Sequence, residues 1–372
     1  MPAPKFDPKG TVLISGAGPS GLAAAIYLKQ HGIDVEIHEA KSTVGTRWRR
    51  GSQILENVSE KTDIIEEFKR LGIKINFNTS AVQNVTLWNG GETKANFESK
   101  LPLGYYVNRG NHPGDFDRGL YDQAVELGVN IIFGSRKKCE DVHIVATGPR
   151  RVDGIGKEIT FSTQAEDRMT VMLDPELAPG GYAYLFIAKG HATIGMAILG
   201  RYKEIDTFFI KTIERFSHLE GVDIQRGGEA NLYANFFLQK SGPSPVNFVG
   251  EAGGFQDYLF GFGMRYAVQS GTLAAKCLIE GKSFEKLSNQ FLLKKQKISL
   301  WNRFFYERFQ KWLPKYFINQ AQKSGDIREY LGSWYHVNPA KIITSDIIRS
   351  IWSRRLTLDK KELYDTRSVN SK

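Results

Sequence analysis

The sequence predicts an α/β protein in which a Rossmann-like βαβ unit is combined with an inserted antiparallel sheet and a C-terminal helical region. Three observations predict this fold. A glycine-rich motif joins a β-strand to a helix near the N-terminus, and short strands rich in β-branched and aromatic residues follow residue 157. Beyond residue 286, aromatic residues recur at spacings of three and four, which is typical of a helix.

Length and composition favour two interleaved domains of an ordinary globular protein. The chain has 372 residues, of which 41% are hydrophobic and 24% are charged. Its net charge of +10 favours an acidic protein partner, an anionic substrate or an anionic membrane surface. No nucleic-acid-binding motif accompanies this charge, so we expect no nucleic-acid partner.

The first motif lies within residues 11–39. It reads Gly16-Ala17-Gly18-Pro19-Ser20-Gly21, and the strand after the helix ends at Glu39-Ala40. Gly16 permits a tight turn, Gly18 lets the backbone approach a pyrophosphate, and Gly21 lets the helix pack on the strand. A carboxylate at Glu39 can accept a hydrogen bond from a ribose hydroxyl. The motif therefore predicts a site for an adenine dinucleotide.

Two later segments are expected to return to this site. Ala146-Thr147-Gly148 ends one apolar strand and Gly250-Glu251 ends another, and small residues there allow close approach to a dinucleotide. The Glu251 carboxylate can accept hydrogen bonds from ribityl hydroxyls. A loop with Gly261 and Gly263 then precedes a helix starting at Met264, whose N-terminus can stabilise negative charge on a reduced flavin. One βαβ unit with three converging segments predicts FAD rather than NAD.

Several charged and sulfur-containing residues have two interpretations. Arg47 can contact the pyrophosphate or the ribityl chain, or belong to a solvated loop. Arg118 and Arg109 can approach a flavin or substrate, or form ordinary salt bridges. Cys139 and Cys277 are far apart in the sequence, and we expect both to be buried, reduced thiols in the cytoplasm.

Aromatic residues mark two further features. Tyr182, Tyr184 and Phe186 share one strand face by their period-two spacing, and either line a substrate cavity or serve sheet packing. The residues from Trp301 to Tyr316 are expected to form one stripe on one helix, with Pro314 near its end. That helix either packs on the core or borders a lipid channel or membrane surface.

The remaining elements follow from apolar periodicity and from glycine and proline positions. Expected strands span 73–77, 81–88, 93–97, 129–133, 142–148, 157–164, 168–173, 181–188, 192–199 and 229–238. Expected helices span 60–70, 119–127, 203–219 and 264–279. We expect an FAD-binding domain of residues 1–150 and 240–285, a sheet domain of 75–110 and 151–239, and a helical region of 286–372.

The three motifs, taken in order, resemble those of flavoproteins built like p-hydroxybenzoate hydroxylase, and within them the geranylgeranyl reductase family. The closer resemblance rests on the segment 182–190, on Ala192-Thr193-Ile194-Gly195 and on Ser270-Gly271. Tyr184 stands where the family has tryptophan, and Ile187 where it has proline. Glu251 stands where the family usually has aspartate. The Asp-Gly signature typical of flavin hydroxylases has no clear counterpart in this sequence, and a cysteine pair found in some relatives is absent.

The resemblance implies an FAD-dependent reductase that saturates carbon–carbon double bonds of an isoprenoid lipid. The reductant would be a reduced ferredoxin, a flavodoxin or NAD(P)H, and the positive charge suits an acidic protein donor. Two alternatives remain open: a flavin monooxygenase or halogenase, and an electron-transfer flavoprotein that donates to a quinone. The expected location is the cytoplasm, with peripheral contact to the inner membrane face as an option.

Overall fold

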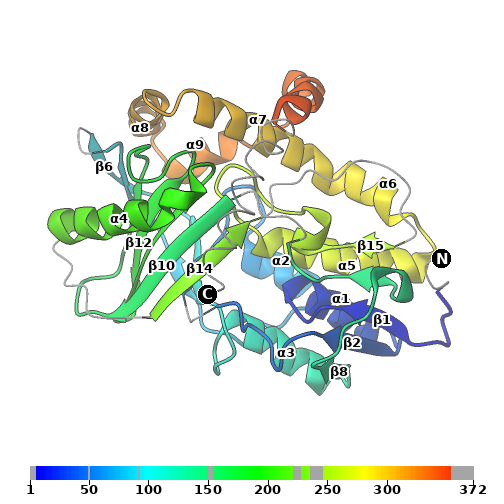
Figure 1. Ribbon diagram of the computed structural model, residues 1–372. Helices are drawn as coiled ribbons and strands as arrows, with labels where there is room; N and C mark the ends of the chain where they lie inside the picture. The colour runs from blue at the N-terminus through cyan, green and yellow to red at the C-terminus, as the bar shows by residue number, and fades with distance from the viewer. Residues whose placement is uncertain are drawn as a thin grey trace.

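Three β-sheets organise the computed structural model, which describes residues 6–48, 51–90, 93–149, 154–220, 228–234 and 246–352 (Figure 1). The first sheet is parallel. Its strands are β1 (Val12–Ser15), β2 (Val35–Glu39), β8 (Asn130–Phe133), β9 (Ile144–Val145) and β15 (Asn247–Phe248), in the order β15-β9-β1-β2-β8. β1 is the central strand. β2, the next strand along the chain, lies on one side of it, and β9 lies on the other. The carboxyl ends of these three strands therefore meet at a switch in strand order, where α/β sheets bind ligands.

Helices cover this sheet at very close range. α1 (Pro19–Gln30) packs against both α5 (Met264–Glu280) and α3 (Phe116–Glu126). A Cβ atom at Gly271 would lie 2.1 Å from the carbonyl oxygen of Ser20, so only glycine allows α5 to approach α1 this closely. The small residues of α1 and the Ser270-Gly271 pair thus serve one helix contact.

The second sheet has seven strands and is mixed, whereas an antiparallel sheet was expected. The strands are β5 (Asn84–Trp88), β6 (Lys94–Glu98), β10 (Gly154–Ser162), β11 (Arg168–Met172), β12 (Tyr182–Ala188), β13 (His191–Ile198) and β14 (Gly228–Ala234). Their order is β14-β10-β13-β12-β11-β5-β6. β11 pairs with β5 in parallel because about eighty residues separate them in the chain, so no hairpin joins them. Residues 235–238 of the last expected strand lie outside the described residues.

A third, three-stranded sheet was not expected. It consists of β3 (Ser52–Glu56), β4 (Ser80–Val82) and β7 (Gly104–Asn108), in the order β3-β7-β4. The segment 75–110 is therefore shared between two sheets. The expected strand at 73–77 is wrong: Ile73 and Phe77 are buried by core packing, without a ladder partner among the described residues. α2 (Ile64–Arg70) begins later than predicted because Asp63 caps it, accepting a hydrogen bond from the Ile65 amide.

The remaining helices lie over the sheets. α4 (Ile205–Glu220) covers one face of the seven-stranded sheet, and α7 and α8 run along the top of the view in Figure 1. The C-terminal elements are α6 (Phe284–Ser288), a π-helical turn (Asn289–Leu293), α7 (Lys294–Arg308), α8 (Leu313–Lys323), α9 (Ile327–Ser333) and a final helix at 339–352. Short 3₁₀ turns occupy Cys139–Asp141, Tyr202–Glu204 and Gly250–Gly253.

The single aromatic helix expected over 301–316 is wrong. A turn at 309–312 separates two helices, and Pro314 lies in the first turn of the second helix, α8, where its missing N–H costs nothing. Trp301 and its neighbours in α7 are partly buried, whereas Trp312 and Tyr316 are exposed.

Cys139 is exposed and Cys277 is buried, so the expectation of two buried thiols is confirmed only for Cys277. No helix in the described ranges is long and apolar enough to cross a membrane.

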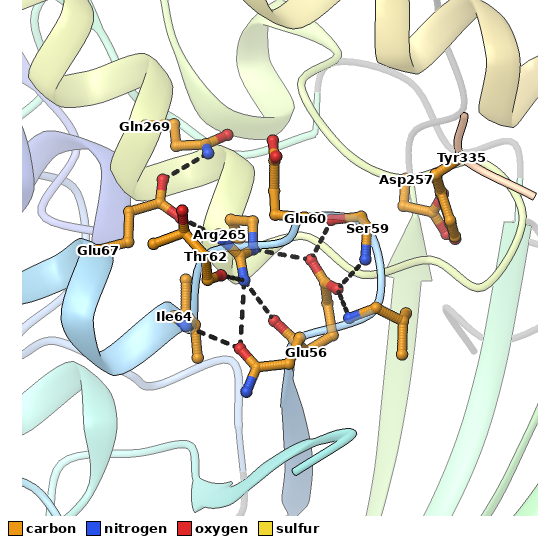
Figure 2. Close-up of polar contacts among 12 residues, drawn as sticks. Glu56, Ser59, Glu60, Thr62, Ile64, Glu67, Asp257, Arg265, Gln269 and Tyr335 are labelled. Atoms are coloured by element: carbon orange, nitrogen blue, oxygen red, sulfur yellow. Dashed lines mark hydrogen bonds and ion pairs between the residues drawn. The ribbon is translucent and has the colours of Figure 1, made fainter. Parts of the chain in front are cut away.

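A buried arginine fixes α5 to the loop after β3. Arg265, in the first turn of α5, forms ion pairs with Glu56 at 3.0 Å and with Glu67 of α2. Figure 2 shows the guanidinium reaching into this loop, where it also donates to the carbonyl oxygens of Glu56 and Thr62. Arg265 is 1% exposed and Glu56 is 2% exposed. The pair therefore sets where the N-terminus of α5 lies relative to the third sheet.

Replacing Arg265 by methionine is expected to destabilise the protein by about 3–5 kcal/mol, because it leaves the Glu56 carboxylate buried without its cation. Urea unfolding measures the change. Arg118→Met is the matched control: Arg118 forms a half-exposed pair with Asp122 on its own helix, so its loss is expected to cost less than about 1 kcal/mol. Equal losses in the two variants would contradict this account.

Candidate dinucleotide site

The first two glycine-containing loops are in backbone contact at the carboxyl ends of β1 and β9. Gly16 has a φ of +102°, and a Cβ there would lie 2.4 Å from the carbonyl oxygen of Ala146. A Cβ at Gly21 would lie 2.0 Å from the carbonyl oxygen of Gly16. Both positions require glycine, as the motif predicted. The turn after β1 is therefore held directly against Ala146.

The third loop joins them through Ser20. Gly250 follows β15 with a φ of +56°, and a Cβ there would lie 2.6 Å from the hydroxyl oxygen of Ser20. The Gly250 amide donates to the hydroxyl of Ser270 in α5 at 2.9 Å. The structure thus brings together the loops that were expected to converge, although they are separated by more than two hundred residues.

Four other glycines border open space. At Gly18 the nearest atom to an added Cβ would be the Ala146 oxygen, 4.0 Å away, and at Gly148, Gly261 and Gly263 nothing lies within 4 Å. Gly18 precedes α1 and Gly263 precedes α5, and neither helix start is capped by a side chain. Uncapped helix N-termini leave N–H groups available and attract negative charge. Two such termini therefore face accessible space at this edge of the sheet.

Glu39 is held beside the glycine loop. Its two carboxylate oxygens accept hydrogen bonds from the amides of Ala17, in the glycine loop, at 2.8 Å and of Lys41, after Ala40, at 2.9 Å. These bonds fix the carboxylate at the end of β2 while leaving lone pairs for a further donor. This position suits contact with a ribose hydroxyl, as expected from the sequence.

The predicted site arginines behave differently from one another. Arg47 donates to the Glu251 carboxylate at 2.8 Å, so the loop after β2 is joined to the loop after β15. Arg118 contacts Asp122 and the Tyr121 ring on its own helix. Among the described residues it makes no contact with the glycine loops. For Arg118 the structure supports the salt-bridge alternative.

Arg109 also forms a salt bridge, but a buried one. It makes two hydrogen bonds to Asp117, at 2.7 and 2.8 Å, and its guanidinium lies 4.4 Å from the centre of the Trp48 ring. Two parallel bonds to a buried carboxylate orient the guanidinium. The pair connects the end of β7 to α3, close to the loop that carries Arg47.

The three aromatic residues of β12 lie together on one face. Tyr184 stacks on Phe186 with ring centres 4.6 Å apart, and Tyr182 lies 6.1 Å from Tyr184. The Tyr182 hydroxyl donates to the carbonyl oxygen of Phe260, just before Gly261. Phe262 packs against the same cluster. This aromatic row is thus anchored to the loop that leads into α5, and it is also packed as sheet core.

Two buried carboxyl groups near this row were not identified from the sequence. Burial raises the pKa of Asp257 to about 6, although hydrogen bonds from Ser299 and Tyr335 act in the opposite direction and lower it. Burial likewise raises the pKa of Glu158, on β10, to about 7. A glutamate within an alternating strand pattern gives no signal of its own, and only the sheet register reveals its neighbours.

Comparison with known proteins supports the Rossmann-like fold. Residues 14–65 match the family model described as an NAD(P)-binding Rossmann-like domain. Digeranylgeranylglycerophospholipid reductase 3 of Methanosphaera stadtmanae is 23% identical, covering 96% of this chain and 98% of its own length. A digeranylgeranylglycerophospholipid reductase of Methanosphaerula palustris is also 23% identical, covering 97% and 98%.

Solved structures share the fold. A geranylgeranyl bacteriochlorophyll reductase-like protein of Thermoplasma acidophilum superposes with a TM-score of 0.70 at 18% identity, covering 90% of this chain and 96% of its own. CmlS, a flavin-dependent halogenase, has a TM-score of 0.58 at 15% identity, covering 94% and 78%. The chain is therefore a homologue, over nearly its whole length, of proteins named digeranylgeranylglycerophospholipid reductase, and it has the Rossmann-like fold that its first motif predicted.

Proposed function

We propose that this protein is an FAD-dependent reductase of carbon–carbon double bonds in an isoprenoid lipid. The observation that carries the proposal is the junction of three glycine-containing loops beside the aromatic row of β12. Homologues named for reduction of digeranylgeranylglycerophospholipids support the reaction class. A hydrophobic row next to a dinucleotide site is what an apolar substrate requires.

The residues present fit FAD. The space at Gly18 and the uncapped start of α1 would receive the pyrophosphate, and Glu39 would bind the ribose. Glu251, oriented by Arg47, would accept from the ribityl chain. The uncapped start of α5 at Gly263 and Met264 would face the negative edge of the flavin ring.

In the proposed reaction the chain positions the lipid and excludes water. FAD, when bound and reduced, supplies a hydride to one alkene carbon. Tyr182 is fixed by its bond to Phe260, and stacking between Tyr184 and Phe186 keeps their rings rigid. Such a wall can hold a flexible isoprenoid in one orientation, which lowers the entropic part of the barrier.

The partners are also part of the proposal. The net charge of +10 supports docking of an acidic electron carrier such as a ferredoxin or flavodoxin, with NAD(P)H as the other reductant. Trp312 and Tyr316, exposed at the start of α8 beside Lys311 and Lys315, support peripheral contact with an anionic membrane.

Gly18→Val tests the cofactor site. Its backbone (φ −78°, ψ 177°) accepts any residue, and the nearest atom to a Cβ is 4.0 Å away, so the variant is expected to fold. The added side chain would fill the space that the pyrophosphate needs, so the affinity for FAD, measured by titrating flavin-free protein with FAD, should fall at least tenfold, or by about 1.4 kcal/mol of binding free energy. Gly281→Asn, at the far end of α5 with open space around it, is the control and should keep its flavin. Full flavin occupancy in Gly18→Val would show that the site is misplaced.

The reaction itself is tested by anaerobic photoreduction of the protein followed by incubation with polyprenyl lipids. Mass spectrometry should detect a gain of two hydrogens for each saturated bond, since each double bond takes up a hydride and a proton. NADPH oxidation with peroxide release or substrate oxygenation would favour the monooxygenase and halogenase class. Rapid reduction by a partner protein with electron transfer to a quinone, and no change in any lipid, would favour an electron-transfer flavoprotein.

A further inference from the structure

Glu158 and Tyr184 meet across a strand that lies between them. In the sheet register Gly195 of β13 pairs with Glu158 of β10 on one side and with Tyr184 of β12 on the other. A Cβ at Gly195 would lie 2.2 Å from the Tyr184 ring. Because Gly195 has no side chain, the phenol crosses β13, and its hydroxyl lies 3.0 Å from a Glu158 carboxylate oxygen.

The Glu158 carboxyl group is buried and incompletely bonded. It is 1% exposed, and the oxygen that meets Tyr184 also accepts from the Gln53 amide at 3.1 Å. Among the residues that the structure describes, its other oxygen has no hydrogen-bond partner, and it faces the backbone of Gly51, where a Cβ would lie 1.9 Å away. A buried carboxyl oxygen without a donor disfavours the ionised form.

Among the described residues, few charged groups face this carboxyl. β3 presents Gln53 and β12 presents Tyr184, while Arg109, after β7, is a nearby cation that is already paired with Asp117. Ala230 of β14 pairs in register with Glu158 on its other side. Burial therefore outweighs the three groups that favour ionisation, Tyr184, Arg109 and Gln53, and the pKa of Glu158 is raised to about 7.

The Tyr184 ring belongs to the buried aromatic row that the proposed function assigns to the substrate. It lies within the cluster that includes Phe186 and Phe262, between Tyr182 and Phe186 in the aromatic row. One end of the phenol thus contacts a proton-holding group, and the ring belongs to the face that the proposed function assigns to the lipid.

We propose that Glu158 and Tyr184 form a proton relay, in which Tyr184 protonates the substrate carbon and Glu158 acts through it as a positioning and proton-supplying residue. The proposal rests on the proposed function, whose reduced flavin is the reductant. The hydride bonds to one alkene carbon, and the electron pair of the double bond takes the phenol hydrogen of Tyr184 as that O–H bond breaks. The phenolate then takes the proton of Glu158, which recovers one from water.

The protonation state of Glu158 determines which group donates the hydrogen bond between its carboxyl and the Tyr184 hydroxyl. A neutral carboxyl donates to the phenol oxygen and leaves the phenol hydrogen free for the substrate, whereas a carboxylate accepts that hydrogen. The active form is therefore the protonated one. Reduction is expected to be fast below the raised pKa of about 7 and to fall about tenfold per pH unit above it.

Single-turnover reduction of a polyprenyl lipid by the prereduced protein, followed on both sides of that pKa, tests the relay. Glu158→Gln does not titrate and cannot resupply a proton, so it should lose the alkaline fall in rate and slow the turnover. Tyr184→Phe should slow proton transfer by roughly 10²- to 10⁴-fold with little change in lipid affinity. Tyr106→Phe is the matched control: Tyr106 packs on Phe186, but its hydroxyl donates to the Arg168 carbonyl, so the pH profile should persist.

A second readout needs no lipid. In oxidised protein carrying ¹³C-labelled glutamate, infrared spectra should show a protonated carboxyl band that titrates near neutral pH and is missing from Glu158→Gln. Absence of that band, or an active wild-type protein whose pH profile survives in Glu158→Gln, overturns the relay alone. A wild-type protein that reduces no lipid overturns the proposed function, and the infrared titration distinguishes the two failures.

Discussion

The contact between Gly16 and the carbonyl group of Ala146 is the constraint on which the site depends. A turn at a φ of +102°, with no room for a Cβ, holds the start of α1 against the end of β9. Once α1 is fixed there, its close contact with α5 through Gly271 fixes the second helix start as well. The site is therefore assembled by positions where side chains are absent, and the polar residues around it are placed as a consequence.

The part of the fold that could be predicted from sequence is the part in which local signals agree. Strand, glycine turn, helix and terminal acid follow one another within residues 11–39, and each step has a local physical cause. The mixed pairing of β5 with β11 and the small sheet of β3, β7 and β4 depend on contacts between distant segments. The aromatic spacing over 301–316 suggested one helix, because residue spacing alone cannot reveal the turn at 309–312. Pro314 lies in the first turn of the helix that follows this turn.

The candidate site shows the same division. The spacing of Gly16, Gly18 and Gly21 predicts the dinucleotide-binding loop, because each glycine is required by a local feature of the backbone. The pairing of Arg47 with Glu251 joins residues 204 positions apart, so the sequence could suggest both as site residues but not their contact. For Arg118 the sequence allowed either a cofactor contact or an ordinary salt bridge, and the structure pairs it with Asp122, four residues further along α3.

Glu158 lies at the limit of what a sequence can reveal. A charged residue in a strand is ordinarily assigned to the solvent face, and nothing nearby marks this one as buried. Its position follows from Gly195, which looks like a weak point in a strand and instead lets a tyrosine reach across the ladder. Burying a carboxyl whose second oxygen finds no donor among the described residues costs free energy, and shape complementarity alone does not compensate for that cost. The family resemblance places tryptophan where this chain has Tyr184. In this chain the exchange puts a hydroxyl within 3.0 Å of Glu158, so the buried acid and the departure from the family motif have one physical explanation.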